Sequence, residues 1–173
     1  SSLISQGVKI EDILKIAVEK SILLANSEAA YLLLKDDKTG DFVVKVAEGA
    51  KAQAMLTITV SPEEKLFERL IKFNKPLVLD SENRQKELSG AFFKKFGVKN
   101  TLVVPVYLQG KVDVILGIGN DRSDFAYQDE DMEMLDIFAK QMAIAVENDL
   151  LNQRVEKLEI TDALTGLYNK QFI

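Results

Sequence analysis

The sequence predicts an α+β domain in which helices pack on an antiparallel sheet and a long helix follows at the C-terminus. Two pairs of apolar runs are each joined by a turn signal of the kind that closes β-hairpins, at 36–40 and at Gln109-Gly110. Apolar residues recur at helical spacing near both ends of the chain. Hairpins combined with such helices favour an antiparallel sheet that is covered by helices.

The first elements follow from local patterns. Helical spacing predicts a helix from Leu3 to Ala25, most regular from Ile10 onward. The continuous apolar run 30–34 predicts a central strand that is buried on both faces. After the turn at 36–40, alternating residues over 42–47 predict the returning strand of a hairpin.

The middle of the chain has shorter elements. Small and polar residues over 48–53 predict a loop, and alternation over 56–60 predicts a half-buried strand. Ser61-Pro62-Glu63-Glu64 provides the cap, the proline and the acids of a helix start, and this helix should end before Asn74. A short strand is expected at 77–80.

The second hairpin follows another short helix. That helix is expected at 86–96, with Gly97 as its C-cap. Strands at 101–108 and 111–119 flank the tight turn, and 120–127 should be a polar loop. The first and last helices of the chain each need a partner, so we expect them side by side on the same face of the sheet.

The last helix is expected from Gln128 to about Leu158, with acids at the positive end of its dipole. One stripe alternates by three and four residues, the spacing of a coiled-coil seam. This seam comprises Met134, Ile137, Gln141, Ile144, Asn148, Leu151, Val155 and Leu158. A buried asparagine can fix register and oligomeric state, so the stripe predicts a parallel homodimer. The alternative is an amphipathic core helix with a frayed end.

Composition limits the function. The 173 residues are 47% hydrophobic and 28% charged, which is ordinary for a globular protein. The net charge is −5 without a basic stripe, so we expect no nucleic-acid partner. No apolar run approaches the roughly 20 residues of a membrane span, so we expect a cytoplasmic location without membrane contact.

The sequence has no cysteine and no histidine. Disulfides, thiolate nucleophiles, Cys/His zinc sites and the commonest general base are therefore absent. On the same grounds we expect neither haem nor bilin, and no metal site, while any other cofactor remains unknown.

Several phrases of this sequence occur together in one family. They are Asn74-Lys75-Pro76-Leu77-Val78-Leu79-Asp80, Thr101-Leu102-Val103-Val104-Pro105-Val106, Gly117-Ile118-Gly119-Asn120, and the segments 125–130 and 138–148. In this order over residues 3–158 they resemble the GAF fold, a small-molecule sensing domain. The resemblance implies a GAF-like antiparallel sheet with helices packed on it.

The stretch after the long helix carries a more specific pattern. Asp162-Ala163-Leu164-Thr165-Gly166-Leu167-Tyr168-Asn169-Lys170 resembles the opening of GGDEF domains, which make cyclic di-GMP from two GTP molecules. The matching residues are Asp162, Leu164, Thr165, Gly166, Leu167 and Asn169. A turn alone would need Gly166 and Asn169 but not the leucines and threonine in these places.

The two resemblances divide the chain. They imply a sensor body over 1–127, a long helix and linker over 128–160, and the first residues of a GGDEF domain over 161–173. The sequence ends at Ile173, before any catalytic signature of a cyclase. These residues are therefore expected to have no catalytic site, and the longer protein to be a diguanylate cyclase.

A ligand pocket is expected between the sheet and the 86–96 helix. Its predicted rim is Phe73, Leu79, Asp80, Phe92, Phe96 and Val103. Asp80 is the polar candidate, although it could instead cap the following turn. Phenylalanines at helical spacing also suit a filled core, so the sensor reading competes with a ligand-free dimerisation module.

A third possibility is a cyclic-nucleotide receptor. GAF domains that bind cyclic nucleotides often carry an Asn-Lys…Phe…Asp-Glu signature. Asn120, Phe125, Asp129 and Glu130 fit it, but Asp121 stands where the lysine would be. The asparagine and phenylalanine are more simply a turn residue and a loop anchor.

Overall fold

The computed structural model describes residues 8–80 and 94–172, and its sheet has six strands in the order β3-β2-β1-β6-β5-β4. The strands are β1 (Ala29–Lys35), β2 (Phe42–Gly49), β3 (Thr59–Val60), β4 (Leu77–Asp80), β5 (Asn100–Leu108) and β6 (Lys111–Asn120), and all neighbours pair antiparallel. The helices are α1 (Val8–Leu24), α2 (Ala52–Met55), α3 (Lys65–Phe73) and α5 (Asp129–Phe172), with a further helical turn at 94–96. The predicted α+β class is confirmed.

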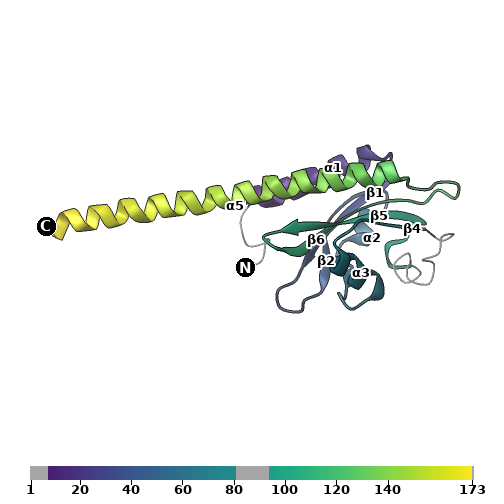
Figure 1. Cartoon of the computed structure of the whole chain (residues 1–173), viewed down its shortest axis with the longest axis horizontal. Helices are drawn as coiled ribbons and strands as arrows, with labels where there is room; N and C mark the ends of the chain where they lie inside the picture. The colour runs from purple at the N-terminus through teal and green to yellow at the C-terminus, as the bar shows by residue number, and fades with distance from the viewer. Residues whose placement is uncertain (1–7, 81–93, 173) are drawn as a thin grey trace.

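Helices cover both faces of the sheet. Figure 1 shows α1 and α5 side by side above it, and α2 and α3 on the opposite side. The central strand β1 contributes side chains to a core on each face of the sheet. Leu32 points into the first core, under α1 and α5, while Tyr31 and Leu33 point into the second core on the opposite face. A strand that is buried on both faces reads as a continuous apolar run, as predicted for 30–34.

The two long helices run antiparallel over the first core. At one end the Lys9 Nζ lies 3.7 Å from the Oδ1 of Asp149, and at the other the Tyr127 hydroxyl is 2.7 Å from the Ser27 hydroxyl. Leu14 and Val18 of α1 and Leu135 of α5 are buried between the helices and the sheet. The expected juxtaposition of the first and last helices is confirmed.

The second hairpin has the geometry that its sequence predicts. Gln109 and Gly110 have φ angles of 50° and 81°, the left-handed pair of a type I′ turn. The amide of Gln109 donates to the Oε1 of Glu147 at 3.3 Å, so the hairpin tip also contacts α5.

Three local predictions in the middle of the chain are wrong. The amide of Glu64 donates to the carbonyl of Ser61, and the amide of Glu63 to the Ser61 hydroxyl, so these residues close a turn and α3 begins only at Lys65. The predicted loop over 48–53 is interrupted by α2, which begins at Ala52. The strand predicted for 56–60 is interrupted at Thr57, whose φ of 75° is a left-handed conformation.

The predicted end of the long helix near Leu158 is also wrong, because α5 continues to Phe172. Residues 129–172 contain no proline. A single glycine such as Gly166 costs about 1 kcal/mol in a helix interior, which is too little to end a helix. Among the described helices, α5 included, none is both long and apolar enough to cross a bilayer.

The buried side chains of Tyr31 and Tyr127 predict that the folded state loses stability at alkaline pH. Burial raises the pKa of Tyr31, which the hydrogen bond to Thr101 only partly offsets, and burial likewise raises the pKa of Tyr127. A raised pKa in the folded state means that the unfolded chain ionises first, so stability is intact below about pH 10 and falls above it. Each phenol contributes up to about 1.4 kcal/mol per pH unit.

The measurement is the urea midpoint of unfolding between pH 8 and 11. The midpoint is expected to fall above pH 10, and less steeply in Tyr127→Phe, which retains only one of the two buried phenols. Equal slopes in the two proteins would contradict the assignment to Tyr127.

Candidate functional site

Three of the residues predicted to line a pocket meet in the second core. Leu79 of β4, Phe96 of the helical turn and Val103 of β5 are each at most 2% exposed. The ring of Phe96 lies 4.7 Å from that of Tyr31. This is the side of the sheet on which the pocket is expected, and the described side chains there pack closely.

Of the other three, Phe73 and Asp80 lie elsewhere. Phe73, at the end of α3, is 57% exposed and not part of this core. Asp80 is half-buried and lines a polar hollow of about 250 Å³ together with Lys99 and Arg122. Phe92 lies outside the described residues. The pocket as a unit therefore stays a prediction.

The second core contains a buried chain of hydroxyl groups. The Tyr31 hydroxyl is 2.7 Å from Thr101 Oγ1, which donates to the carbonyl of Ile118 at 2.7 Å. Thr101 has one proton to give, so Tyr31 donates to Thr101. The Tyr31 ring fits only because position 117 is glycine, where a Cβ would lie 2.2 Å from the ring.

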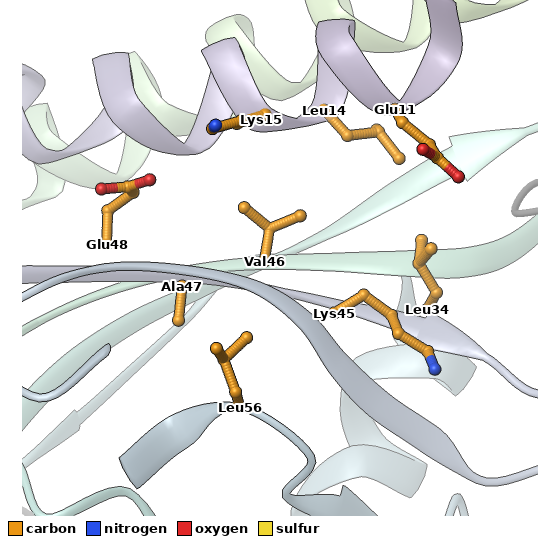
Figure 2. A pocket seen from close by; sticks show the side chains of 9 residues that line it. All are labelled: Glu11, Leu14, Lys15, Leu34, Lys45, Val46, Ala47, Glu48 and Leu56. Carbon is orange, nitrogen blue, oxygen red and sulfur yellow. The ribbon is translucent and has the colours of Figure 1, made fainter. Parts of the chain in front are cut away.

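A groove that the sequence did not predict lies between α1 and β2 (Figure 2). Its volume is about 450 Å³. Leu14 of α1 and Val46 of β2 extend into the space between these elements, and Ala47 and Leu56 lie on the other side of the strand. Charged side chains of both signs surround it: Glu11, Lys15, Lys45 and Glu48.

The groove exists because β3 is short. β3 pairs in register with only Phe42 and Val43, so the outer edge of β2 from Lys45 onward has no neighbouring strand in the described structure. An apolar floor with a mixed charged rim can bind a ligand.

The predicted seam lies on the bare face of α5. Its apolar members are Met134, Ile137, Ile144, Leu151, Val155 and Leu158, and they are between 39% and 68% exposed. Gln141 and Asn148 are exposed as well. The opposite face is buried against the domain through Leu135, Ala139, Met142, Val146 and Leu150. The helix thus has two apolar faces, of which the domain covers one.

The remaining predicted residues have other surroundings. Buried Asn120 donates to the Tyr127 hydroxyl at 3.1 Å, and the Phe125 ring meets that of Tyr127 edge-on at 4.8 Å. Asn120 and Phe125 therefore anchor the loop before α5. Asp129 and Glu130 are exposed in the first turn of α5.

The residues of the GGDEF-opening motif, 162–169, continue the backbone of α5, and their side chains lie outside the described part. Among the described residues, no three acidic side chains gather closely enough to hold a metal ion.

The comparison with protein families decides the identity of the fold. The model of the GAF domain family matches residues 8–147, which span α1, the whole sheet and the covered part of α5. The chain belongs to the GAF domain family. It is therefore a domain of sensory type, as its sequence resemblance implied. No curated protein matches the sequence.

Solved GAF domains have the same fold. The blue-light absorbing PixJ GAF domain of Thermosynechococcus elongatus is 16% identical, with a TM-score of 0.69 over 90% of this chain and 91% of that one. The second GAF domain of DevS from Mycobacterium smegmatis is 16% identical, with a TM-score of 0.69 over 84% and 99%. A GAF domain/HD domain protein of Geobacter sulfurreducens is 14% identical, with a TM-score of 0.65 over 82% and 94%.

The prediction that excludes haem and bilin is corrected by these neighbours. PixJ is a light-absorbing receptor, and further similar structures are cyanobacteriochromes. The same fold therefore occurs in light-absorbing receptors. The missing cysteine concerns only a thioether attachment to this chain, and it does not support excluding the whole class.

Proposed function

We propose that this GAF domain is the regulatory small-molecule sensing and dimerisation module of a cytoplasmic bacterial diguanylate cyclase, and that it controls cyclic di-GMP synthesis by a GGDEF domain that follows it. The observation that carries the proposal is the two-faced α5. One face packs on the sensor domain, the other is bare and apolar, and the same helix leads into the GGDEF-opening motif.

The bare face supports a parallel homodimer. In a heptad assignment that begins at Met134, the first-position residues include Gln141 and Asn148, and the fourth-position residues are Ile137, Ile144, Leu151 and Leu158. A polar residue at the first position favours one register at some cost in stability. The seam continues beyond Leu150, the last residue of α5 in the domain core.

A dimeric helix could connect sensing to synthesis, because cyclic di-GMP forms when two GTP-loaded domains meet. A ligand changes their arrangement only if it binds one arrangement of the dimer more tightly than the other. The second core and the groove beside α1 are two places in the described structure that a small molecule could use.

A second candidate function is a ligand-free dimerisation module. Close packing of Tyr31, Phe96 and Val103 in the second core favours it, since that core holds three of the predicted pocket residues. In this case α5 would join two subunits without a chemical input.

The test is a native mass spectrum of the purified chain, with titrations of cAMP and cGMP. A dimer that carries extra mass supports the sensor, and a bare dimer that no compound stabilises favours the structural module. A monomer over a wide concentration range contradicts both. Extending the chain past Ile173 and assaying conversion of GTP tests the cyclase assignment separately.

A further inference from the structure

We propose that Lys51 is a latch between the second core and the loop that leads into α5. The inference rests on the proposed sensory function, since it names the contact through which ligand binding in the second core would affect α5. Lys51 directly precedes α2. Its ammonium donates to the carbonyl of Gly97 and lies 3.2 Å from the Oδ2 of Asp121.

One end of the latch is attached to the core. Gly97 follows Phe96, whose ring is buried against Tyr31. Gly97 has a φ of 69°, which turns the chain at the end of the helical turn 94–96 and exposes its carbonyl to Lys51. Any ligand that displaced the Phe96 ring would also move the carbonyl that Lys51 holds.

The other end is attached to the loop before α5. Asp121 directly follows β6, and its amide donates to the Oε1 of Glu28 at 2.8 Å. The next residue is held as well, since the Asn100 Nδ2 donates to the Arg122 carbonyl at 2.8 Å. This loop ends at Tyr127, two residues before α5 begins.

The strength of the contacts suits a switch. The side chains of Lys51 and Asp121 are 39% and 47% exposed, so water and salt weaken their ion pair. Lys51 also donates to the neutral carbonyl of Gly97, so one ammonium group joins the two segments. When that carbonyl moves away, the loop loses its link to the core and is held less firmly, by the bonds at Asp121 and Arg122.

The test is hydrogen–deuterium exchange of the ligand-free chain. In Lys51→Met the amides of 97–100 and 121–123 are expected to exchange roughly three to ten times faster, because both segments lose the same partner. The control is Lys140→Met, which removes the 3.1 Å pair with Asp136 inside α5 and links no separate segments. It should leave both segments unchanged.

Salt provides a second readout. Exchange at 121–123 should increase with sodium chloride in the wild type and stay flat in Lys51→Met, because screening acts on the pair that the variant lacks. Unchanged exchange at 121–123 in Lys51→Met would overturn the latch. Equal acceleration throughout the domain, β1 included, would also overturn it, since that is loss of general stability.

These results are separable from the fate of the proposed function, because exchange is measured without a ligand, a dimer or a cyclase. If Lys51→Met speeds exchange at 97–100 and 121–123 in a chain that is monomeric and binds no ligand, the latch stands and only the proposed function is refuted.

Discussion

Replacing Leu151 by lysine is expected to convert the proposed dimer into a monomer at micromolar concentration. Leu151 is 57% exposed in the single chain and lies one residue beyond the last core residue of α5, so the domain itself does not need it. In a parallel dimer two lysines would face each other in the seam, which adds charge repulsion to the lost apolar contact. We expect a dissociation constant at least about 100-fold weaker, corresponding to about 2.7 kcal/mol.

The measurement is sedimentation over a range of concentrations. The matched control is Asn152→Lys, which adds the same charge at the next residue, outside the seam, and should leave the dimer intact. Thermal unfolding of the Leu151→Lys monomer should keep the cooperativity of the domain. A Leu151→Lys chain that is as dimeric as the wild type would contradict the seam.

Gly117→Ala is expected to cause a large loss of stability, about 3 kcal/mol. The new Cβ would lie 2.2 Å from Cζ of Tyr31, and that ring is fully buried. The ring has little room to move, because its hydroxyl is bonded to Thr101 and Phe96 packs against it. Overpacking of this kind usually costs 1–3 kcal/mol, and more where the neighbours are fixed.

Urea denaturation measures the effect, and Tyr31→Leu supplies the control. The single Tyr31→Leu variant is destabilised by its cavity, but Gly117→Ala should cost clearly less in that background, because the clashing atoms are gone. Equal costs in both backgrounds would mean that the ring is not the reason for the glycine.

Sequence reasoning succeeded where a pattern is local. The run 30–34 gave β1, Gln109-Gly110 gave the second hairpin, and heptad spacing gave the apolar face that lies bare on α5. Each depends on residues within a few positions of one another, so periodicity and turn chemistry are sufficient.

Sequence reasoning failed where residues far apart in the chain determine the structure. The groove beside α1 depends on how late β3 begins, after the left-handed Thr57, and no sequence pattern predicts that conformation. The contacts of Lys51 span 46 and 70 residues, so only the folded chain brings its partners together. The end of α5 is predicted too early because the residues after Leu158 are assigned to a following domain, although no proline in 129–172 ends the helix.

The length of α5 has a geometric consequence. Residues 151–172 extend the helix by roughly 33 Å beyond its last core residue, at about 1.5 Å and 100° per residue. Whatever the helix carries at its far end therefore has an orientation that is set by counting residues. Inserting seven residues would preserve that phase, whereas inserting two would turn the far end to the opposite side. The helix thus sets the orientation of its far end as well as its distance from the domain.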